Sequence, residues 1–301
     1  MGIKNIIGEL QVNGKPVLTE KYSEGLSYEL SEDSTYYIVT GMGTCTDEEL
    51  IIPSEYNGLP VKEIGDYAFQ YVDNSWDYTA GVTSGGNNLH DFVKKVVIPD
   101  SVTKIGTNAF AILDEDWLEN FSTTLETVEM GNNVTECGEM AFGCCNRLHE
   151  IKLSNALIKI SNHMFWRCDA LKEINLPKDI TAIEPYAFAA CYQLTELSVP
   201  DKVASIGDEA FAGSEIVKLV IPKSVITIGE IIFGEEAILQ AIYCEAETKP
   251  DGWSDYWVGE GTPVIWGFVK DFEAVNDKLG DISSALDSII AQTNAIIGGT
   301  E

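Results

Sequence analysis

The residue types that most often carry catalysis are few, or unsuitably spaced, in this sequence. The three histidines, His90, His149 and His163, do not form the H-x-x-x-H pattern of a metal-binding helix. There is no G-x-S-x-G nucleophile motif and no phosphate-binding glycine loop. Asp and Glu number 48, so pairs of carboxylates are common and say little about a site. We therefore expect a protein with no enzymatic activity and no cofactor.

The seven cysteines suggest a structural role. Their number is odd and no C-x-x-C pair occurs, which argues against a zinc site, and no metal site is expected. Cys145, Cys168 and Cys191 recur at intervals of 23, each three residues after a phenylalanine. A free cysteine behaves as a small hydrophobic residue, so a ladder of buried thiols is expected here in preference to disulfides. Cys137 aligns with Ile160 and is also expected in the core.

The charge of the chain excludes some partners. With 19 basic and 48 acidic residues, the formal net charge is −29. Phosphate backbones and anionic membranes would be repelled, so neither nucleic acid nor a membrane is expected as a partner. The acidity suits solubility, and binding of cations or of basic partners stays open.

Targeting signals are not evident in the sequence. No run approaches the roughly 18 apolar residues of a membrane span. The first residues carry one lysine and lack a long apolar stretch, unlike a signal peptide. As written, the sequence predicts a protein that stays in the cytoplasm, or that reaches a virion or the extracellular space after lysis. A signal removed from the sequence is the alternative.

A repeat of phenylalanines is the strongest pattern. The steps between them are 41, 32, 23, 23, 23 and 22. A unit of 23 residues lies within the range of leucine-rich repeats. The repeat predicts a leucine-rich-repeat solenoid, mostly β with short helical turns. The phenylalanines are Phe69, Phe110, Phe142, Phe165, Phe188, Phe211 and Phe233.

Each rung follows the pattern L-x-x-I-x-L-P-x-x-V-x-x-I-x-x-x-A-F-x-x-C. In one rung, Leu171, Ile174 and Leu176 alternate as on a short strand with one face inward. Pro177 ends that strand because it has no backbone donor. Ile183 belongs to the returning side, and an Ala-Phe pair fills the turn. No rung buries its apolar face alone, so neighbouring rungs depend on one another.

This pattern resembles the BspA-like leucine-rich-repeat family over residues 26–268. The stretch that begins GLSYELSEDSTYYIVTG looks like the family's opening hairpin, and AIYCEAETKPDGWSDYWVGEGTPVIWGF resembles its closing segment. The resemblance implies a cell-surface adhesion or interaction protein without enzymatic activity in its repeats. Most members would carry a signal peptide or a wall anchor, and neither is seen here.

The two ends differ from the repeat. Residues 1–25 contain Val12-Asn13-Gly14-Lys15, which predicts a tight hairpin or a docking arm. Residues 269–301 follow the solenoid, and their apolar residues alternate in steps of 3 and 4 through residue 289. That spacing predicts an amphipathic helix that packs on the solenoid or joins copies of the chain through residues 269–297. The segment 285–299 resembles the end of phage and prophage tail-region proteins.

Two inserts interrupt the repeat and are candidates for binding. The first, near residues 70–92, carries Tyr71, Trp76 and Tyr78, and the second, near residues 111–124, carries Trp117 and Phe121. Both follow the phenylalanine turn, so they should emerge on the same side of the solenoid. Long loops on a rigid scaffold are common binding sites. The alternative is that their aromatic residues cover the edge of a rung.

Two other groups are candidate surfaces. Glu150, Glu173 and Glu196 recur at intervals of 23 on the outward side of the strands. They predict a solvated face, a stripe for a basic ligand or a calcium-binding stripe. The second group is rich in tryptophan and is expected to cap the last rung, with a sugar platform as the alternative. Its members are Trp253, Tyr256, Trp257 and Trp266.

The favoured function at this point is a phage- or prophage-encoded structural protein, possibly associated with a tail. Its solenoid would bind a protein or glycan on a bacterial or mucosal surface. The alternative is a bacterial BspA-like cell-surface adhesin. Aromatic residues of the inserts and the repeated glutamates are the candidate binding residues for both.

Overall fold

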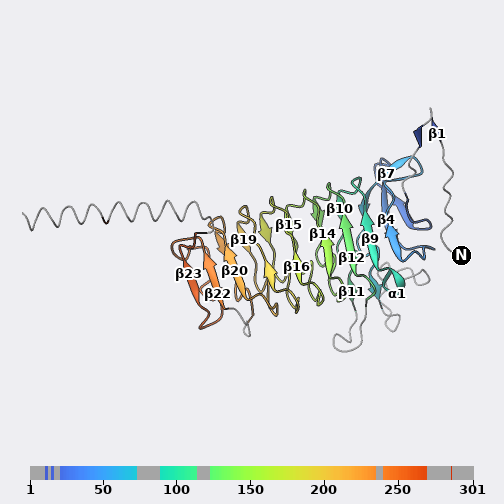
Figure 1. Cartoon of the computed structure of the whole chain (residues 1–301). Coiled ribbons are helices and arrows are strands. Elements are labelled where there is room, and N and C mark those ends of the chain that lie inside the picture. The colour runs from blue at the N-terminus through green and yellow to red at the C-terminus, as the bar shows by residue number, and fades with distance from the viewer. Residues whose placement is uncertain are drawn as a thin grey trace, which may run out of the picture.

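The computed structural model describes residues 11–12, 15–16, 21–72, 89–113, 123–234, 240–269 and 286. Within them the chain forms successive rungs that stack along one axis (Figure 1). The predicted leucine-rich-repeat solenoid is thereby confirmed. The predicted helix over residues 269–301 lies outside the described residues, apart from positions 269 and 286.

The strands at the N-terminal end pair as hairpins. Val12 pairs with Lys15 in an antiparallel ladder, and residues 13–14, where the tight turn was predicted, lie outside the described residues. A second antiparallel hairpin opens the solenoid, and its second strand pairs in parallel with the first returning strand, so the hairpin is continuous with the stack. These strands are β1 (Gln11–Val12), β2 (Lys15–Pro16), β3 (Ser27–Leu30), β4 (Tyr37–Gly41), β6 (Glu55–Tyr56) and β7 (Leu59–Ile64).

One side of the solenoid is built from parallel strands, one from each rung. The outward-facing residues of these strands are called the strand face below. The strands are β5 (Glu49–Ile51), β9 (Lys95–Ile98), β12 (Thr127–Met130), β14 (Glu150–Lys152), β16 (Glu173–Ile174), β18 (Glu196–Leu197), β20 (Lys218–Ile221), β22 (Ala241–Cys244) and β23 (Val264–Trp266).

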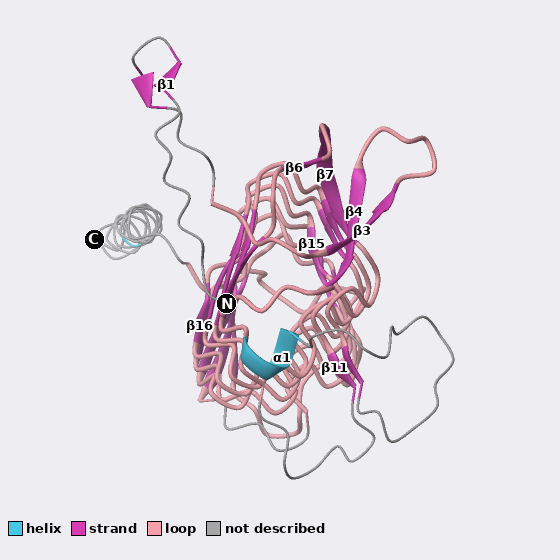
Figure 2. Cartoon of the chain, turned by 90° about the vertical axis from the view of Figure 1, so that its right-hand side faces the viewer, coloured by secondary structure: helices cyan, strands magenta, loops and turns pink. Residues whose placement is uncertain are grey.

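The opposite side carries the returning strands, as the separation of β15 from β16 in Figure 2 shows. From β15 to β21, residues 22 or 23 apart pair, so the sequence repeat is also the register of this part of the sheet. The strands are β10 (Lys104–Ile105), β13 (Glu136–Cys137), β15 (Lys159–Ile160), β17 (Ala182–Ile183), β19 (Ser205–Ile206) and β21 (Thr227–Ile228).

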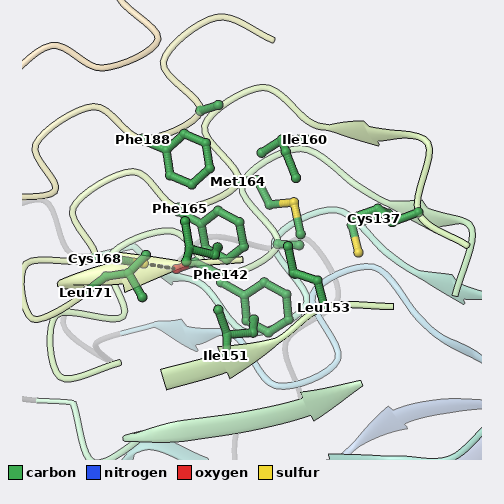
Figure 3. Packing of buried hydrophobic residues seen from close by; sticks show 14 of the residues in the cluster. Cys137, Phe142, Ile151, Leu153, Ile160, Met164, Phe165, Cys168, Leu171 and Phe188 are labelled. Carbon is green, nitrogen blue, oxygen red and sulfur yellow. Dashed lines mark hydrogen bonds between the residues drawn. The ribbon is translucent and has the colours of Figure 1, made fainter. Parts of the chain in front are cut away.

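The phenylalanines form a continuous stack between the two sides. Neighbouring ring centroids are 5.1–6.0 Å apart, and five of the seven side chains are completely buried. Figure 3 shows Phe142, Phe165 and Phe188 in this stack. Stacked rings at this distance bury large apolar areas and attract one another in offset geometry. The stack is therefore the main apolar column of the fold.

The predicted thiol ladder runs beside the phenylalanines. Cys145, Cys168 and Cys191 are free and buried, as is Cys137 on the returning side. The Sγ atom of each ladder cysteine donates to the carbonyl of a phenylalanine in the preceding rung, at 3.1–3.3 Å. The dashed line in Figure 3 marks the bond made by Cys168. The column is thus linked by hydrogen bonds as well as by packing.

The corner before each phenylalanine contains a residue with left-handed backbone geometry. Two residues before the phenylalanine, φ lies between 43° and 59° in all seven rungs, although none of these residues is glycine. The amide at this corner bonds to the next rung, as in the bond from His163 N to the Pro185 carbonyl. These inter-rung bonds compensate a conformation that ordinary L-residues seldom adopt. The residues are Tyr67, Asn108, Met140, His163, Tyr186, Glu209 and Ile231.

The single rung from Leu171 to Cys191 matches its predicted orientation closely. Leu171, Ile174 and Ile183 are buried, whereas Leu176 is only partly buried and Pro177 lies inside. Among the described residues the one α-helix is α1 (Leu89–Phe92), a single turn at the end of the first insert. Leu89 of this turn is buried against the core, so α1 returns the chain to the rung.

Candidate binding surface on the strand face

In the N-terminal part of the strand face, charges are paired across rungs. The Lys95 ammonium lies 2.6 Å from a Glu129 carboxylate oxygen and 3.6 Å from one of Glu49. Lys21 lies 3.0 Å from the other oxygen of Glu49. The hydrogen bond from Lys21 is the main cause of the lowered pKa of Glu49, and Lys95 adds to it. Exposed pairs like these stabilise modestly, but they leave little free charge.

The middle of the strand face carries the three predicted glutamates. Glu150, Glu173 and Glu196 are all exposed, and Glu173 lies directly opposite Glu196 in the register of β16 and β18. In the described part of the chain, none of the three side-chain carboxylates makes a hydrogen bond or ion pair. Like charges at adjacent strand positions repel. The structure therefore brings together three carboxylates that a positively charged partner would neutralise.

The C-terminal part of the strand face is apolar. Val220, Tyr243 and Ile265 form one row in the register of β20, β22 and β23. The Phe268 ring packs edge-on against Tyr243, with centroids 5.0 Å apart. The Lys218 ammonium lies 4.7 Å from the Tyr243 ring centroid. This group was missed in the sequence because its members come from rungs where the repeat pattern fades.

The predicted binding residues of the inserts are mostly outside the described part. Tyr71 lies in β8 (Tyr71–Val72), which pairs in parallel with β11 (Ile112–Leu113). The two inserts therefore begin at neighbouring strands, whereas their course beyond these strands lies outside the described residues, so their emergence on one side stays a prediction. The remaining four residues lie among those that the structure does not describe. They are Trp76, Tyr78, Trp117 and Phe121.

The tryptophan group closes the last rungs. Trp253 and Trp257 are 3% and 4% exposed, and their ring centroids are 4.9 Å apart. The indole N–H of Trp253 donates to the Val225 carbonyl at 3.1 Å, and Trp266 packs on both rings. Tyr256, by contrast, is 71% exposed. The predicted cap is confirmed for the tryptophans, whose burial is incompatible with a sugar platform at Trp253 and Trp257.

The remaining groups with reactive chemistry are in unreactive environments. Burial raises the pKa of every ladder thiol well above its ordinary value, and raises that of Cys144 to about 12. His163 stacks on Tyr186 with centroids 4.7 Å apart, and burial lowers its pKa. Among the described residues, no three His, Cys, Asp or Glu side chains are placed to hold a metal ion. No helix found there has the length and apolar character to cross a membrane.

Comparison with known proteins identifies the repeats. Residues 113–239 match the model of the BspA type leucine rich repeat region in six copies. No curated protein matches the chain. These matches lend no support to the resemblance of residues 285–299 to phage tail-region proteins.

Solved structures resemble the fold. A leucine-rich cell surface protein from Faecalibacterium prausnitzii is 24% identical, with a TM-score of 0.54 over 80% of this chain and 58% of that one. A leucine-rich-repeat protein from Bacteroides ovatus is 21% identical, with a TM-score of 0.43 over 82% and 70%. The leucine-rich-repeat protein of T. pallidum is 18% identical, with a TM-score of 0.44 over 87% and 96%.

The first of these three likenesses shows a shared fold, and this chain spans just over half the length of that protein. The family match covers the regular rungs, where the thiol ladder and the phenylalanine stack from Phe142 onwards lie. The rungs between residues 113 and 239 therefore resemble BspA type leucine-rich repeats, and the chain folds as a leucine-rich-repeat solenoid.

Proposed function

We propose that this protein is a non-enzymatic, cell-surface type of leucine-rich-repeat protein that binds a basic surface on a protein partner. The observation that carries the proposal is the row of Glu150, Glu173 and Glu196 on the strand face, whose carboxylates have no ion-pair partner within the described ranges. A rigid solenoid holds these groups in place before binding, so little entropy is lost when a partner docks.

The kind of protein is supported by the comparisons. The F. prausnitzii protein is described as a leucine-rich cell surface protein, which favours the alternative of a bacterial surface protein. A phage origin has no such support and is not proposed. The net charge of −29 adds long-range attraction for a basic partner and faster encounter at low salt.

The inserts supply a second, separate contact in this proposal. They leave from β8 and β11, two paired strands of the same scaffold, so loops far apart in the sequence start side by side. Aromatic residues such as Trp76 and Trp117 are suited to act as anchors, because aromatic side chains often supply most of the binding energy of an interface.

Substitutions that remove the negative charge but keep the side-chain size test the glutamate row. We expect that changing Glu150, Glu173 and Glu196 together to Gln weakens binding of a fluorescent lysine-rich peptide at least tenfold. Fluorescence anisotropy at low and physiological salt measures this, with a neutral peptide of equal length as a second probe.

The matched control changes three exposed glutamates elsewhere, Glu29, Glu55 and Glu136, to Gln. This control variant loses the same total charge. Because these glutamates lie outside the proposed site, it should alter the affinity less than twofold. Equal losses in the two triple variants would mean that binding follows net charge alone, and the proposed site would be wrong.

A further inference from the structure

We infer that the apolar end of the strand face anchors one helix of the partner, basic in its first half and apolar in its second. This inference rests on the proposed function, because the basic half would meet the three glutamates. It adds the secondary structure of the partner segment and the order of its residues.

The anchor is the row Val220, Tyr243 and Ile265, together with Phe268. The Ile265 side chain is 42% exposed, and it continues the row at the last strand of the sheet. Outward positions of the preceding rungs are instead polar, as at Asn175 and Ser198, both exposed. A row of apolar residues that faces outward on adjacent strands gains free energy when a partner removes it from water.

Lys218 marks the boundary between the two chemistries. It occupies the position of Glu196 one rung later, and its ammonium lies over the rings of Tyr243 and Phe268 at 4.7 and 5.7 Å. Its side chain therefore covers aromatic surface, and its charge disfavours another cation beyond the glutamates. The basic part of a partner is thereby restricted to the rungs of Glu150, Glu173 and Glu196.

Spacing selects a helix over an extended segment. Adjacent strands lie about 4.8 Å apart, and successive turns of a helix about 5.4 Å apart. Alternate residues of an extended chain recur only every 6.6 Å or so, so that chain falls out of step within three rungs. From the rung of Glu150 to that of Ile265 there are about five strand spacings, or roughly 24 Å, which is the length of a helix of about 16 residues.

Charge complementarity determines the residue types in the other half of the helix. Lysine or arginine at positions i, i+4 and i+7 would follow the three glutamates, and apolar residues two or three turns later would reach Tyr243 and Ile265. Charge and hydropathy are thus segregated along one helical face. This differs from an ordinary amphipathic helix, in which they are segregated around the helix.

The test uses two synthetic helix-forming peptides of about 18 residues and identical composition. In the segregated peptide, three lysines precede the leucines along one face; in the permuted peptide, lysines and leucines alternate along that face. With the full chain, we expect the segregated peptide to bind at least fivefold more tightly. Ile265→Ser should remove that advantage, whereas Ile226→Ser should not, because Ile226 is 62% exposed but precedes β21 on the returning side.

The outcomes separate this inference from the proposed function. If Glu173→Gln weakens binding of both peptides equally while Ile265→Ser changes neither, the helix anchor is wrong and the acidic site stands. If Ile265→Ser weakens the segregated peptide and Glu173→Gln has no effect, the anchor stands and the proposed acidic site is overturned. Equal affinity of the two peptides overturns the ordered helix. Circular dichroism of each variant confirms that it is folded.

Discussion

The inward and outward sides of the same strands follow different rules. Inward positions repeat from rung to rung, as the buried phenylalanines and the thiol ladder show. Outward positions change along the axis, from paired charges at Lys95, through unpaired carboxylates at Glu173, to apolar residues at Tyr243. The contrast separates two requirements: stacking demands one residue type at each inward position, while recognition depends on variation at the outward ones.

The largest effect on stability is expected from a substitution on the inward side. Phe188→Ala removes a completely buried ring between two stacked neighbours, and we expect a loss of about 3–5 kcal/mol in the free energy of unfolding. Urea denaturation measures it. Tyr192→Ala is the exposed aromatic control: it lies before β18, its side chain is 49% exposed, and its loss should cost well under 1 kcal/mol. Similar losses at the two sites would contradict the distinction between the sides.

A smaller effect is expected on the inward side at the position where the thiol ladder ends. Ser214 occupies the ladder position of its rung, and its buried hydroxyl has no hydrogen-bond partner among the residues that the structure describes. Ser214→Cys should place a thiol near the Phe188 carbonyl and stabilise the protein by about 1 kcal/mol. Thermal denaturation of the variant and of Ser214→Ala measures this. If Ala stabilises as much as Cys, the benefit comes from removing an unsatisfied hydroxyl and not from extending the ladder.

On the outward side, removing one charge should change the free energy of unfolding in opposite directions in the N-terminal part and in the middle of the strand face. Lys95→Gln breaks two ion pairs and should cost up to about 1 kcal/mol. Glu173→Gln relieves repulsion with Glu196 and should stabilise by a few tenths of a kcal/mol. Both differences should shrink in 1 M NaCl, because salt screens exposed charges. Chemical denaturation at two salt concentrations decides, and destabilisation by both variants would show that the middle glutamates have stabilising partners.

The smallest effect is a pH dependence at Glu49. Its pKa in the folded protein is lowered, chiefly by the hydrogen bond from Lys21, so its ionised form stabilises the fold above the ordinary value of 4.5. That contribution is lost as pH falls through the lowered pKa. Glu49→Gln should therefore be less stable than the original protein by a few tenths of a kcal/mol at pH 7, because solvent screens this exposed group. The urea midpoints of the two proteins should converge towards pH 3, and a constant gap would contradict this origin.

The inward side could be predicted from the sequence because it repeats. A step of 23 between phenylalanines fixes the register, and Cys168 and Cys191 follow from the same count. The left-handed corners were not foreseen, because residues such as Tyr186 and Ile231 have no intrinsic preference for positive φ. They adopt it where hydrogen bonds between rungs impose the turn.

The outward side was only partly predictable. The glutamate row was visible because its three members share one interval, but the pairing of Lys95 with Glu129 crosses a rung of irregular length. The apolar group was missed because Val220, Tyr243 and Ile265 share no residue type and belong to the least regular rungs. Such groups are defined by neighbours in space, which a single sequence does not identify without the register.

The register of 23 residues has a consequence for how such a chain can evolve. Partners on the returning sheet, such as Lys159 and Ala182 or Ala182 and Ser205, are separated by one whole repeat. Excising residues 171–193 would join two equivalent positions and leave Glu150 beside Glu196. We therefore expect insertions and deletions between equivalent positions to preserve the stack when their length is a whole number of 23-codon repeats. Unequal recombination between whole repeats would lengthen or shorten the acidic row by one glutamate at a time. The number of carboxylates on the surface can then change while the inward positions keep the same types of contact.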